Sequence, residues 1–440
     1  MRRLLERVGL GRPELRAWAM YDWANSAWVL TIQTAVFPVY FYEVAAGGLP
    51  ETVALQRYTW TTSIALALVA VAAPILGALA DFLGARKRML GTFLAVGVVA
   101  TACMVLIERG DWLLAAVLFG AANIGAQGAF VFYDSLLPHI AGKEEIDRVS
   151  TAGYALGYLG SAILLALQLA WIISPDTFGL PSGTLPSRLA FLSVAVWWAL
   201  FSIPLFRGVP EPPRRIEPDE TRSQRPIAVA LTRLGETFRN IRSYRQAFVL
   251  LIAFLVYNDG IGTIIRMAEI YGASLGLERN GLIGAIFVAQ LVGIPFTILF
   301  ARLAGRIGPK RAILLGLCVY MGVTVYAYFL ETSRQFYAMA IVVGMVQGGC
   351  QALSRSLFAS LIPRHMTGEF FGFYGVLEKF AALTGPALFG LGVTLTGSVR
   401  SGVLSVLVYF VVGALLLTRV DVEAGRKAAR EAEENLIPLG

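Results

Sequence analysis

The sequence predicts an all-α membrane protein whose twelve transmembrane helices form two pseudo-symmetric six-helix bundles. Its 440 residues are 57% hydrophobic and only 15% charged, whereas soluble domains carry about 25% charged residues. Twelve apolar stretches each come close to the roughly 20 residues that a helix needs to cross a bilayer. They fall into two sets of six, separated by one basic, proline-containing stretch, residues 207–245. A soluble α-protein is a poor alternative, because its helices average only about 10–14 residues.

The apolar stretches set the domain boundaries. A first bundle is expected over residues 18–206, with spans at 18–42, 58–83, 89–107, 112–137, 150–173 and 188–206. A second bundle is expected over residues 246–418, with spans at 246–271, 281–304, 311–330, 336–361, 370–396 and 401–418. Residues 1–17 and 419–440 are then cytoplasmic tails, and residues 207–245 form a cytoplasmic basic linker. Apolar residues recur there every three or four positions and predict an amphipathic helix on the membrane surface: Ile227, Leu231, Leu234, Phe238 and Ile241.

Basic residues predict how the chain is oriented. With the N-terminus inside, 28 Lys and Arg fall in cytoplasmic segments, six in outer loops and three within spans. Cytoplasmic loops carry such an excess. We therefore expect both termini in the cytoplasm and a multi-pass protein of the cell membrane, either an inner or a plasma membrane. The net charge of +8 reflects this topology and predicts no nucleic-acid partner, since the charges are scattered over loops.

The two halves of the chain resemble each other at an offset of 224 or 225 residues. Gly160 of span five corresponds to Gly385 of span eleven. Spans four and ten end in similar strings that contain His139 and His365. Repeats of six helices are typical of secondary transporters, which bind their solute between the halves. The two histidines follow a proline at a cytoplasmic end, so we expect them to be ordinary loop residues.

The loop after the second span carries the most specific local motif. Its pattern is Gly-x-x-x-Asp-x-x-Gly followed by basic residues: Gly77, Asp81, Gly84, Arg86, Lys87 and Arg88. Gly84 permits a tight turn, and Asp81 is suited to a helix N-terminus of the opposite half or to an Arg there. The corresponding loop of the second half, residues 305–311, has Gly305 where Asp81 stands.

This motif resembles the loop 2–3 signature of the major facilitator superfamily, although Ala85 here precedes the basic run. The resemblance implies the major facilitator fold and an inner gate formed by the six motif residues. Asp134, near the cytoplasmic end of span four, is expected either in a gate salt bridge or as a proton site.

Further strings resemble one subgroup of that superfamily. They lie in spans one, seven, ten and eleven and read Tyr21-Asp22-Trp23-Ala24-Asn25-Ser26, Tyr257-Asn258-Asp259-Gly260-Ile261-Gly262-Thr263, Gly348-Gly349-Cys350-Gln351-Ala352-Leu353-Ser354-Arg355-Ser356 and Phe370-Phe371-Gly372. Together they are similar to the "unknown major facilitator" permeases of bacteria, relatives of the autophagy-related vacuolar amino-acid effluxers of fungi. The resemblance covers nearly the whole chain and implies a permease that exports amino acids or related organic molecules.

Polar residues within the spans are the candidates for solute binding and coupling, because each is costly in lipid unless it faces protein or water. They are Asp22, Asn25, Gln33, Asn123, Gln127, Asn258, Asp259, Arg266, Gln347, Gln351, Arg355 and Glu378. In the major facilitator superfamily, spans one, four, seven and ten line the central cavity, which holds most of these positions. The alternative for the Asn and Gln residues is hydrogen bonding between packed helices. The alternative for Arg266 is a pair with Glu269 on the same helix.

The charged candidates suggest roles for a zwitterion or an organic anion. Arg355 or Arg266 would receive the solute carboxylate, while Asp22 or Asp259 would face its amine or a coupling proton. Because burial favours the protonated form of a carboxylate, we expect the proton sites among four residues: Asp22, Asp134, Asp259 and Glu378.

Motifs for other activities do not occur in this sequence. It contains no phosphate-binding loop for ATP and no hydrolase or redox motif. We therefore expect no enzyme, no cofactor and no metal, and a monomer whose partners are the lipid bilayer, a small-molecule solute and, as coupling ion, protons. Three alternatives stay open: a transporter-like membrane sensor, a permease for another small organic ion or drug-like compound, and a lipid-modifying membrane enzyme. The three cysteines lie within spans, where we expect them to pack as small apolar residues: Cys103, Cys318 and Cys350.

Overall fold

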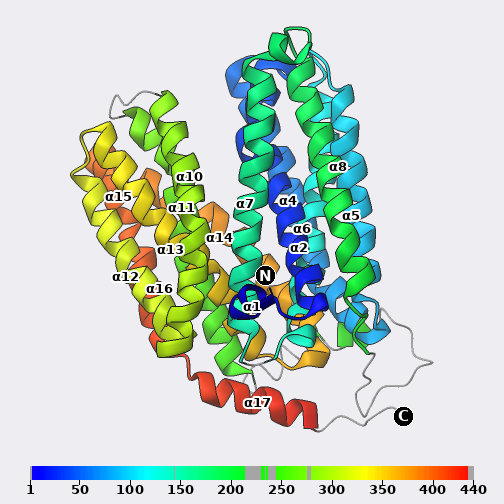
Figure 1. The fold of residues 1–440 in the computed structure, drawn as a ribbon. Coiled ribbons are helices and arrows are strands. Elements are labelled where there is room, and N and C mark those ends of the chain that lie inside the picture. Colours follow the sequence, from blue (N-terminus) through cyan, green and yellow to red (C-terminus); the bar gives the residue numbers. More distant parts are fainter. Residues whose placement is uncertain are drawn as a thin grey trace.

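The protein is almost entirely helical. Its structure is a computed structural model that describes residues 2–142, 144–213, 229–232, 234–235, 244–274 and 279–434. In Figure 1 two groups of long helices stand side by side, and the short helices α1 (Arg2–Arg7) and α17 (Val422–Glu434) lie at one common end. We call this end the terminal side.

The N-terminal half contains the first six predicted spans. They correspond to α2 (Pro13–Trp28) with its continuation to Ala45, α4 (Glu51–Leu83), α5 (Arg86–Cys103) with the 3-10 turn η3 (Met104–Leu106), α6 (Trp112–Ile140), α7 (Ile146–Ile173) and α8 (Leu185–Gly208). A 3-10 turn, η4 (Pro175–Phe178), connects α7 to α8. Helix bounds and predicted spans differ by at most seven residues, at the start of α4, because long apolar stretches flanked by charged or turn residues define both.

The C-terminal half contains the other six. They correspond to α10 (Arg245–Ser274), α11 (Arg279–Ile307), α12 (Pro309–Tyr328), α13 (Ser333–Ser360), α14 (Thr367–Thr396) and the pair α15 (Val399–Ser405) and α16 (Leu407–Thr418). A 3-10 turn, η5 (Arg364–Met366), precedes α14. In the part of the chain that the structure describes, ten helices are each long and apolar enough to cross a membrane.

The first span departs from a regular α-helix. After α2 the chain continues as a π-helical segment η1 (Val29–Ala35), a short α3 (Phe37–Tyr40) and a second π-helical segment η2 (Phe41–Ala45). The wider turns appear as bonds over five residues, from the Val36 amide to the Thr31 carbonyl and from the Ala46 amide to the Phe41 carbonyl. Pro38 between them has no N–H to continue the α-helical ladder. Such π-helical turns are frequent at functional sites.

Glycines let the helices approach closely at corresponding places in the two halves. A methyl group on Gly160 of α7 would collide with Trp23 of α2, and one on Gly385 of α14 would collide with Thr263 of α10. The outer surface is apolar, with side chains such as Val71 and Leu395 more than two-thirds exposed. In water such a surface would be unstable, and in a bilayer it faces lipid.

The described part of the expected amphipathic helix and most of the described C-terminal tail are helical. Most of the predicted amphipathic linker helix lies outside the described residues, and its described parts, 229–232 and 234–235, are helical. The tail after Thr418 continues as α17, which runs beneath the bundles in Figure 1. Gly425 of α17 packs against Leu361 and Gln246, so this helix is held against the C-terminal half.

Candidate functional site

Arg355 of α13 lies at the centre of a buried ionic cluster that joins the two halves. Its Nη2 atom is 3.0 Å from Oδ2 of Asp22 on α2, and its Nη1 atom is 3.1 Å from Oδ1 of Asp134 on α6. Its Nε atom donates to Oγ of Ser150 on α7 at 2.9 Å. We call these four residues the Arg355 cluster. One residue of the C-terminal half thus binds three helices of the N-terminal half.

Aromatic rings enclose the guanidinium group of Arg355. Its Cζ atom lies 4.5 Å from the ring centre of Tyr154, 4.8 Å from that of Trp18 and 5.7 Å from that of Tyr133. Trp18 and Tyr133 stack with their centres 4.5 Å apart, and each donates a side-chain hydrogen bond to the other's backbone carbonyl. The rings shield the guanidinium group from water and add cation–π attraction, which stabilises the Arg355 cluster in this conformation.

The charges of the Arg355 cluster do not balance. It contains one guanidinium group and two carboxylates, and Arg355 and Asp22 are only 3% and 5% exposed. When both carboxylates are ionised, one negative charge is in excess in a site with little access to water. A net charge in a site shielded from water is costly, so a proton or a cationic group would stabilise this site.

Asp81 occupies a second contact between the halves, nearer the terminal side. It lies in the last turn of α4, and its two carboxylate oxygens accept hydrogen bonds from the backbone amides of Gly368 and Glu369 at the start of α14, both at 3.0 Å. Arg86 donates to the same carboxylate at 2.7 Å and to the carbonyl of His365 at 3.2 Å. An anion at a helix N-terminus is favourable, and this one ties α4 to the opposite half.

Glycines make this contact possible. A methyl group on Gly77 would collide with the Gly368 carbonyl, and one on Gly372 would come within 2.7 Å of Pro74 Cα. Gly84 adopts a left-handed conformation with φ 62°, which returns the chain from α4 into α5. Of the other two basic residues of the motif, Lys87 binds Glu211 and the Phe206 carbonyl, and Arg88 is exposed.

Several residues that join α13 to α7 were not among the candidates. Ser356 Oγ donates to Asp147 Oδ1 at 2.5 Å, and Ser150 Oγ donates to the Ala352 carbonyl at 2.7 Å. Both bonds cross between α13 and the start of α7. Short polar residues near a helix end look like ordinary loop residues in a sequence, so no signal set these apart.

The interpretation of the two histidines as loop residues is wrong. His139 Nε2 lies 3.0 Å from Thr367 Oγ1 of the opposite half, and His365 is only 5% exposed. Their corresponding places in the repeat were the one available signal, because equivalent helix ends meet where two related bundles pack together.

Three amide side chains of the N-terminal half are buried with polar atoms that have no hydrogen-bond partner among the described residues. These atoms are Nδ2 of Asn25, both polar atoms of Asn123 and Oε1 of Gln127. Buried polar groups in proteins are nearly always satisfied, so these amides are suited to a solute or water. Gln127 precedes Asp134 by two turns of α6, which places it about 10 Å farther from the terminal side.

The remaining candidates are not members of the Arg355 cluster. Gln33, Asn258, Gln347 and Gln351 are half-buried. Asp259 accepts a hydrogen bond from Thr384 on α14 of its own half, so the structure does not bring it to Asp22. The side chains of Arg266, Glu269 and Glu378 lie outside the described residues. Among the residues that the structure describes, no group of three or more His, Cys, Asp or Glu side chains could hold a metal ion.

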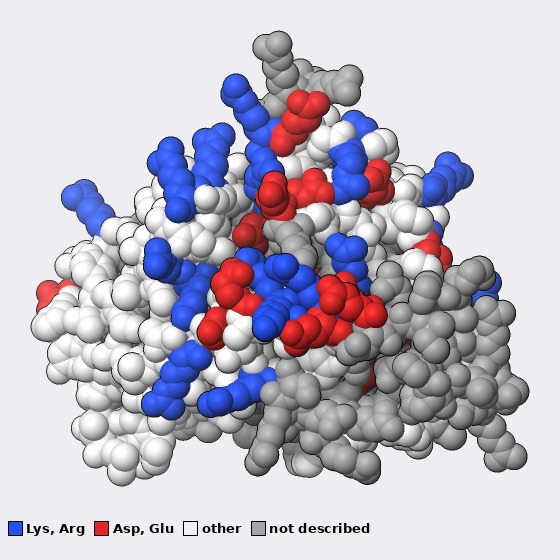
Figure 2. All heavy atoms as spheres, turned by 90° about the horizontal axis from the view of Figure 1, so that it is seen from below, with Lys and Arg blue, Asp and Glu red and all other residues white. Residues whose placement is uncertain are grey.

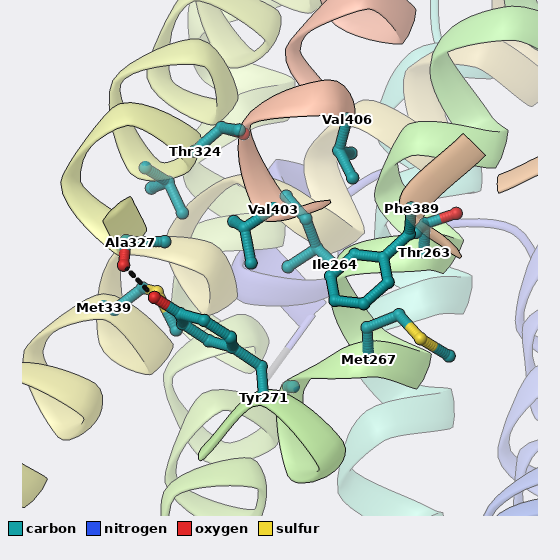
Figure 3. Close-up of a pocket in the computed structure, with 12 residues that line it drawn as sticks. Thr263, Ile264, Met267, Tyr271, Thr324, Ala327, Met339, Phe389, Val403 and Val406 are labelled. Carbon is teal, nitrogen blue, oxygen red and sulfur yellow. Dashed lines mark hydrogen bonds between the residues drawn. The ribbon is translucent and has the colours of Figure 1, made fainter. Parts of the chain in front are cut away.

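A separate pocket inside the C-terminal half is unsuited to a polar solute. It lies between α10, α12, α13, α14 and α15 and is lined mainly by apolar side chains such as Met267, Met339 and Phe389 (Figure 3). Its polar groups already donate to backbone carbonyls: Tyr271 to Ala327, and Thr263 and Thr324 to carbonyls one turn earlier. We therefore assign it to packing within the bundle.

Comparison with known proteins identifies the family. The family model described as "Vacuole effluxer Atg22 like" matches residues 11–147 and 143–430. The chain belongs to this family. An uncharacterized MFS-type transporter YxiO of Bacillus subtilis (strain 168) is 38% identical over 425 residues, which cover 96% of this chain and 98% of that protein. Autophagy-related protein 22-2 of Aspergillus niger is 24% identical over 89% of this chain and 79% of that protein.

Solved structures show the fold of this Atg22-like protein. The human organic anion transporter MFSD10 (TETRAN) superposes with a TM-score of 0.67 at 16% identity, covering 94% of this chain and 99% of that one. The proton:xylose symporter XylE superposes with a TM-score of 0.66 at 13% identity, covering 95% and 96%. The protein thus has the major facilitator fold, and with its relatives it is an MFS-type membrane transporter and not an enzyme.

Proposed function

We propose that this protein is a secondary active permease that moves a small polar organic solute by alternating access, with amino acids as the first class to test and export as its direction. Proteins of this family resemble the vacuole effluxer Atg22, and one protein of the same fold, human MFSD10, is an organic anion transporter. In the permease that we propose, the two halves rock about a central site and open alternately to each side of the membrane.

The observation that carries this proposal is the Arg355 cluster. Its ion pairs cross from α13 to α2 and α6, so they must separate when the halves move apart on the terminal side. Removing one member of a buried ion pair costs about 3–5 kcal/mol. A solute or a proton that replaces a lost partner would offset this cost and so couple binding to opening.

The excess carboxylate of the Arg355 cluster is the proposed coupling site. Protonation of Asp22 or Asp134 leaves Arg355 with one ionised partner and balances the charge. The same guanidinium group, once released from one carboxylate, can receive the carboxylate of a solute. In the closed state, Asp22 and Arg355 therefore bind each other. In the open state, Asp22 binds the proton and Arg355 binds the solute.

The amides of Asn25, Asn123 and Gln127 form the proposed neutral part of the solute site. Their unpartnered atoms include donors and acceptors, which suits a solute with both an amine and a carboxylate. A solute with a net charge would instead require a charged side chain beside these amides to balance it.

The terminal side is the proposed cytoplasmic side. Figure 2 shows this face, where Lys and Arg side chains gather among Asp and Glu. Since cytoplasmic loops carry the basic excess, the Asp81 and Arg355 contacts would close the protein toward the cytoplasm. Asp81, Gly77, Gly84 and Arg86 are then the inner gate.

Transport by purified protein in proteoliposomes tests the proposal. We expect uptake of at least one labelled amino acid from a panel when a proton gradient is imposed across the membrane, and loss of this uptake when a proton ionophore dissipates that gradient. R355A should lower the flux by at least about tenfold, because it leaves Asp22 and Asp134 without their counter-charge. R334Q, which removes an exposed Arg at the other end of α13, is the matched control and should transport normally. Binding of a solute without flux in any gradient would show a sensor and contradict the proposal.

A further inference from the structure

A hollow of about 500 Å³ lies on the C-terminal half, between α11, α12 and α13. Eight of its ten lining side chains are apolar, and the other two are Arg302 and Arg306. Leu299 and Leu315, on facing helices, are each 48% exposed, so the hollow opens to the outside of the bundle. We call it the α11–α13 groove. Its volume is within the range of about 300–1,000 Å³ that small-molecule sites occupy.

The α11–α13 groove has the length of one membrane leaflet. Its lining on α11 runs from Phe296 to Arg306, ten residues that rise about 15 Å. This is half of the roughly 30 Å hydrocarbon thickness of a bilayer. Arg306 precedes the end of α11 by one residue, so the apolar end of the groove lies near mid-membrane and the basic end near the headgroups.

The basic end of the α11–α13 groove is on the terminal side. Lys310, at the start of α12, donates to the carbonyls of Thr418 and Val420, just before α17. Arg302 and Arg306 are one helical turn apart and therefore share a face of α11. Both are exposed.

The positive charge of the α11–α13 groove is not balanced by acids. No Asp or Glu occurs in α11, α12 or α13, and the one acid between Arg279 and Ser360 is Glu331, in the turn that connects the far end of α12 to α13. Within the described residues, neither Arg302 nor Arg306 forms an ion pair. Clustered Arg at the end of an apolar groove is complementary to a phosphate that carries an acyl chain.

We propose that the α11–α13 groove binds an anionic phospholipid from the leaflet on the terminal side. One acyl chain lies along Phe296, Leu299 and Leu315, and the phosphate is bound by Arg302 and Arg306. Apolar contact alone would accept any lipid, so the two arginines give the groove its preference for a net negative headgroup. This proposal depends only on the described surface and is independent of which solute the protein moves.

Native mass spectrometry of the full-length protein in detergent tests the proposal. The protein is titrated in parallel with dioleoyl phosphatidylglycerol and dioleoyl phosphatidylcholine. We expect one phosphatidylglycerol to bind at about tenfold lower concentration than phosphatidylcholine, given the attraction expected for each Arg near an anionic headgroup. The preference should weaken as salt is raised.

Two kinds of variant distinguish the contribution of the two arginines to lipid binding from that of the apolar hollow. R302Q/R306Q should bind both lipids alike, and R109Q/R334Q, which removes two exposed arginines elsewhere, should keep the preference. L315W keeps both arginines but fills the hollow, and it should weaken binding of both lipids. The proposal is overturned if wild-type protein shows no preference, if R302Q/R306Q keeps it, if R109Q/R334Q loses it equally, or if L315W binds both lipids as wild type does.

Discussion

The turn between α4 and α5 and the turn between α11 and α12 occupy corresponding places in the repeat, yet they make opposite kinds of contact. Gly84 and Gly308 both have left-handed φ values, 62° and 87°. Arg86 reaches across to the His365 carbonyl of the opposite half, whereas Lys310 reaches the Thr418 and Val420 carbonyls of its own half.

The difference follows from the residue that precedes each turn. Asp81 is buried against the start of α14, while at the corresponding Gly305 nothing lies within 4 Å of an added methyl group. Both turns thus use a glycine for a positive φ, and the Asp81 carboxylate is present only in the turn that joins the halves. The predictions that follow test this asymmetry with spin labels at the exposed positions R88C and R311C, after replacement of the native cysteines.

The largest effect is expected from D81N. It leaves Arg86, whose side chain is 1% exposed, without its counter-charge, at a cost of about 3–5 kcal/mol. We expect a longer distance between the labels in a large fraction of molecules and a strong loss of flux, with normal insertion into the membrane. G305D is the matched control. A wild-type distance distribution in D81N would show that Asp81 does not hold the halves together.

A somewhat smaller effect is expected from G77A. The added methyl group would collide with the Gly368 carbonyl, and overpacking of this kind costs about 1–3 kcal/mol. The labels should report a mixed population of near and far distances. G305A adds the same methyl group where there is open space and should leave the distances unchanged. Equal behaviour of the two variants would contradict the asymmetry between the turns.

A modest effect is expected from E433A in α17. Glu433 accepts a hydrogen bond from the Arg364 amide at 2.8 Å, and the Arg364 carbonyl in turn accepts one from Arg86 at 3.4 Å. Loss of one such bond costs about 1 kcal/mol, so the far population should rise slightly. E431A removes a more exposed Glu from the same helix and should have no effect on the distance. A larger change of the label distance in E431A than in E433A would show that Glu433 does not stabilise the contact between the halves.

The smallest effect on the halves is expected from K310Q. Lys310 caps the end of α16 within its own half, so its loss should lower the thermal stability of the protein by about 1 kcal/mol and leave the label distance unchanged. The melting temperature in detergent and the distance distribution together check this. A longer distance in K310Q would mean that the second turn also joins the halves.

Much of this arrangement could be predicted from local features of the sequence. The motif from Gly77 to Arg86 was expected to form a gate contact, and Asp81 was expected at a helix N-terminus or beside an Arg. Asp22, Asp134 and Arg355 were each expected to be functional, because a charge within an apolar span is costly unless it has a partner. Their mutual pairing was not predicted, and they were assigned different roles.

The missing information was the distance between residues far apart in the chain. Arg355 and Asp22 are separated by 333 positions, and neither periodicity nor spacing relates the rotation of one helix to that of another. The sequence did not predict the contacts between the halves made by Ser150, Asp147 and His139 for the same reason. Each of these residues matters only because a helix end of the opposite half packs against it.

The sequence by itself determined the helices, their boundaries and the glycine turns, because apolar length, flanking charge and backbone freedom are local properties. The tertiary structure alone decided which charges meet, which of two equivalent turns enters the opposite half, and where a basic groove is left open on the bundle surface. These outcomes depend on how two related bundles pack together, and the free energy of that packing is distributed over contacts that no single segment contains.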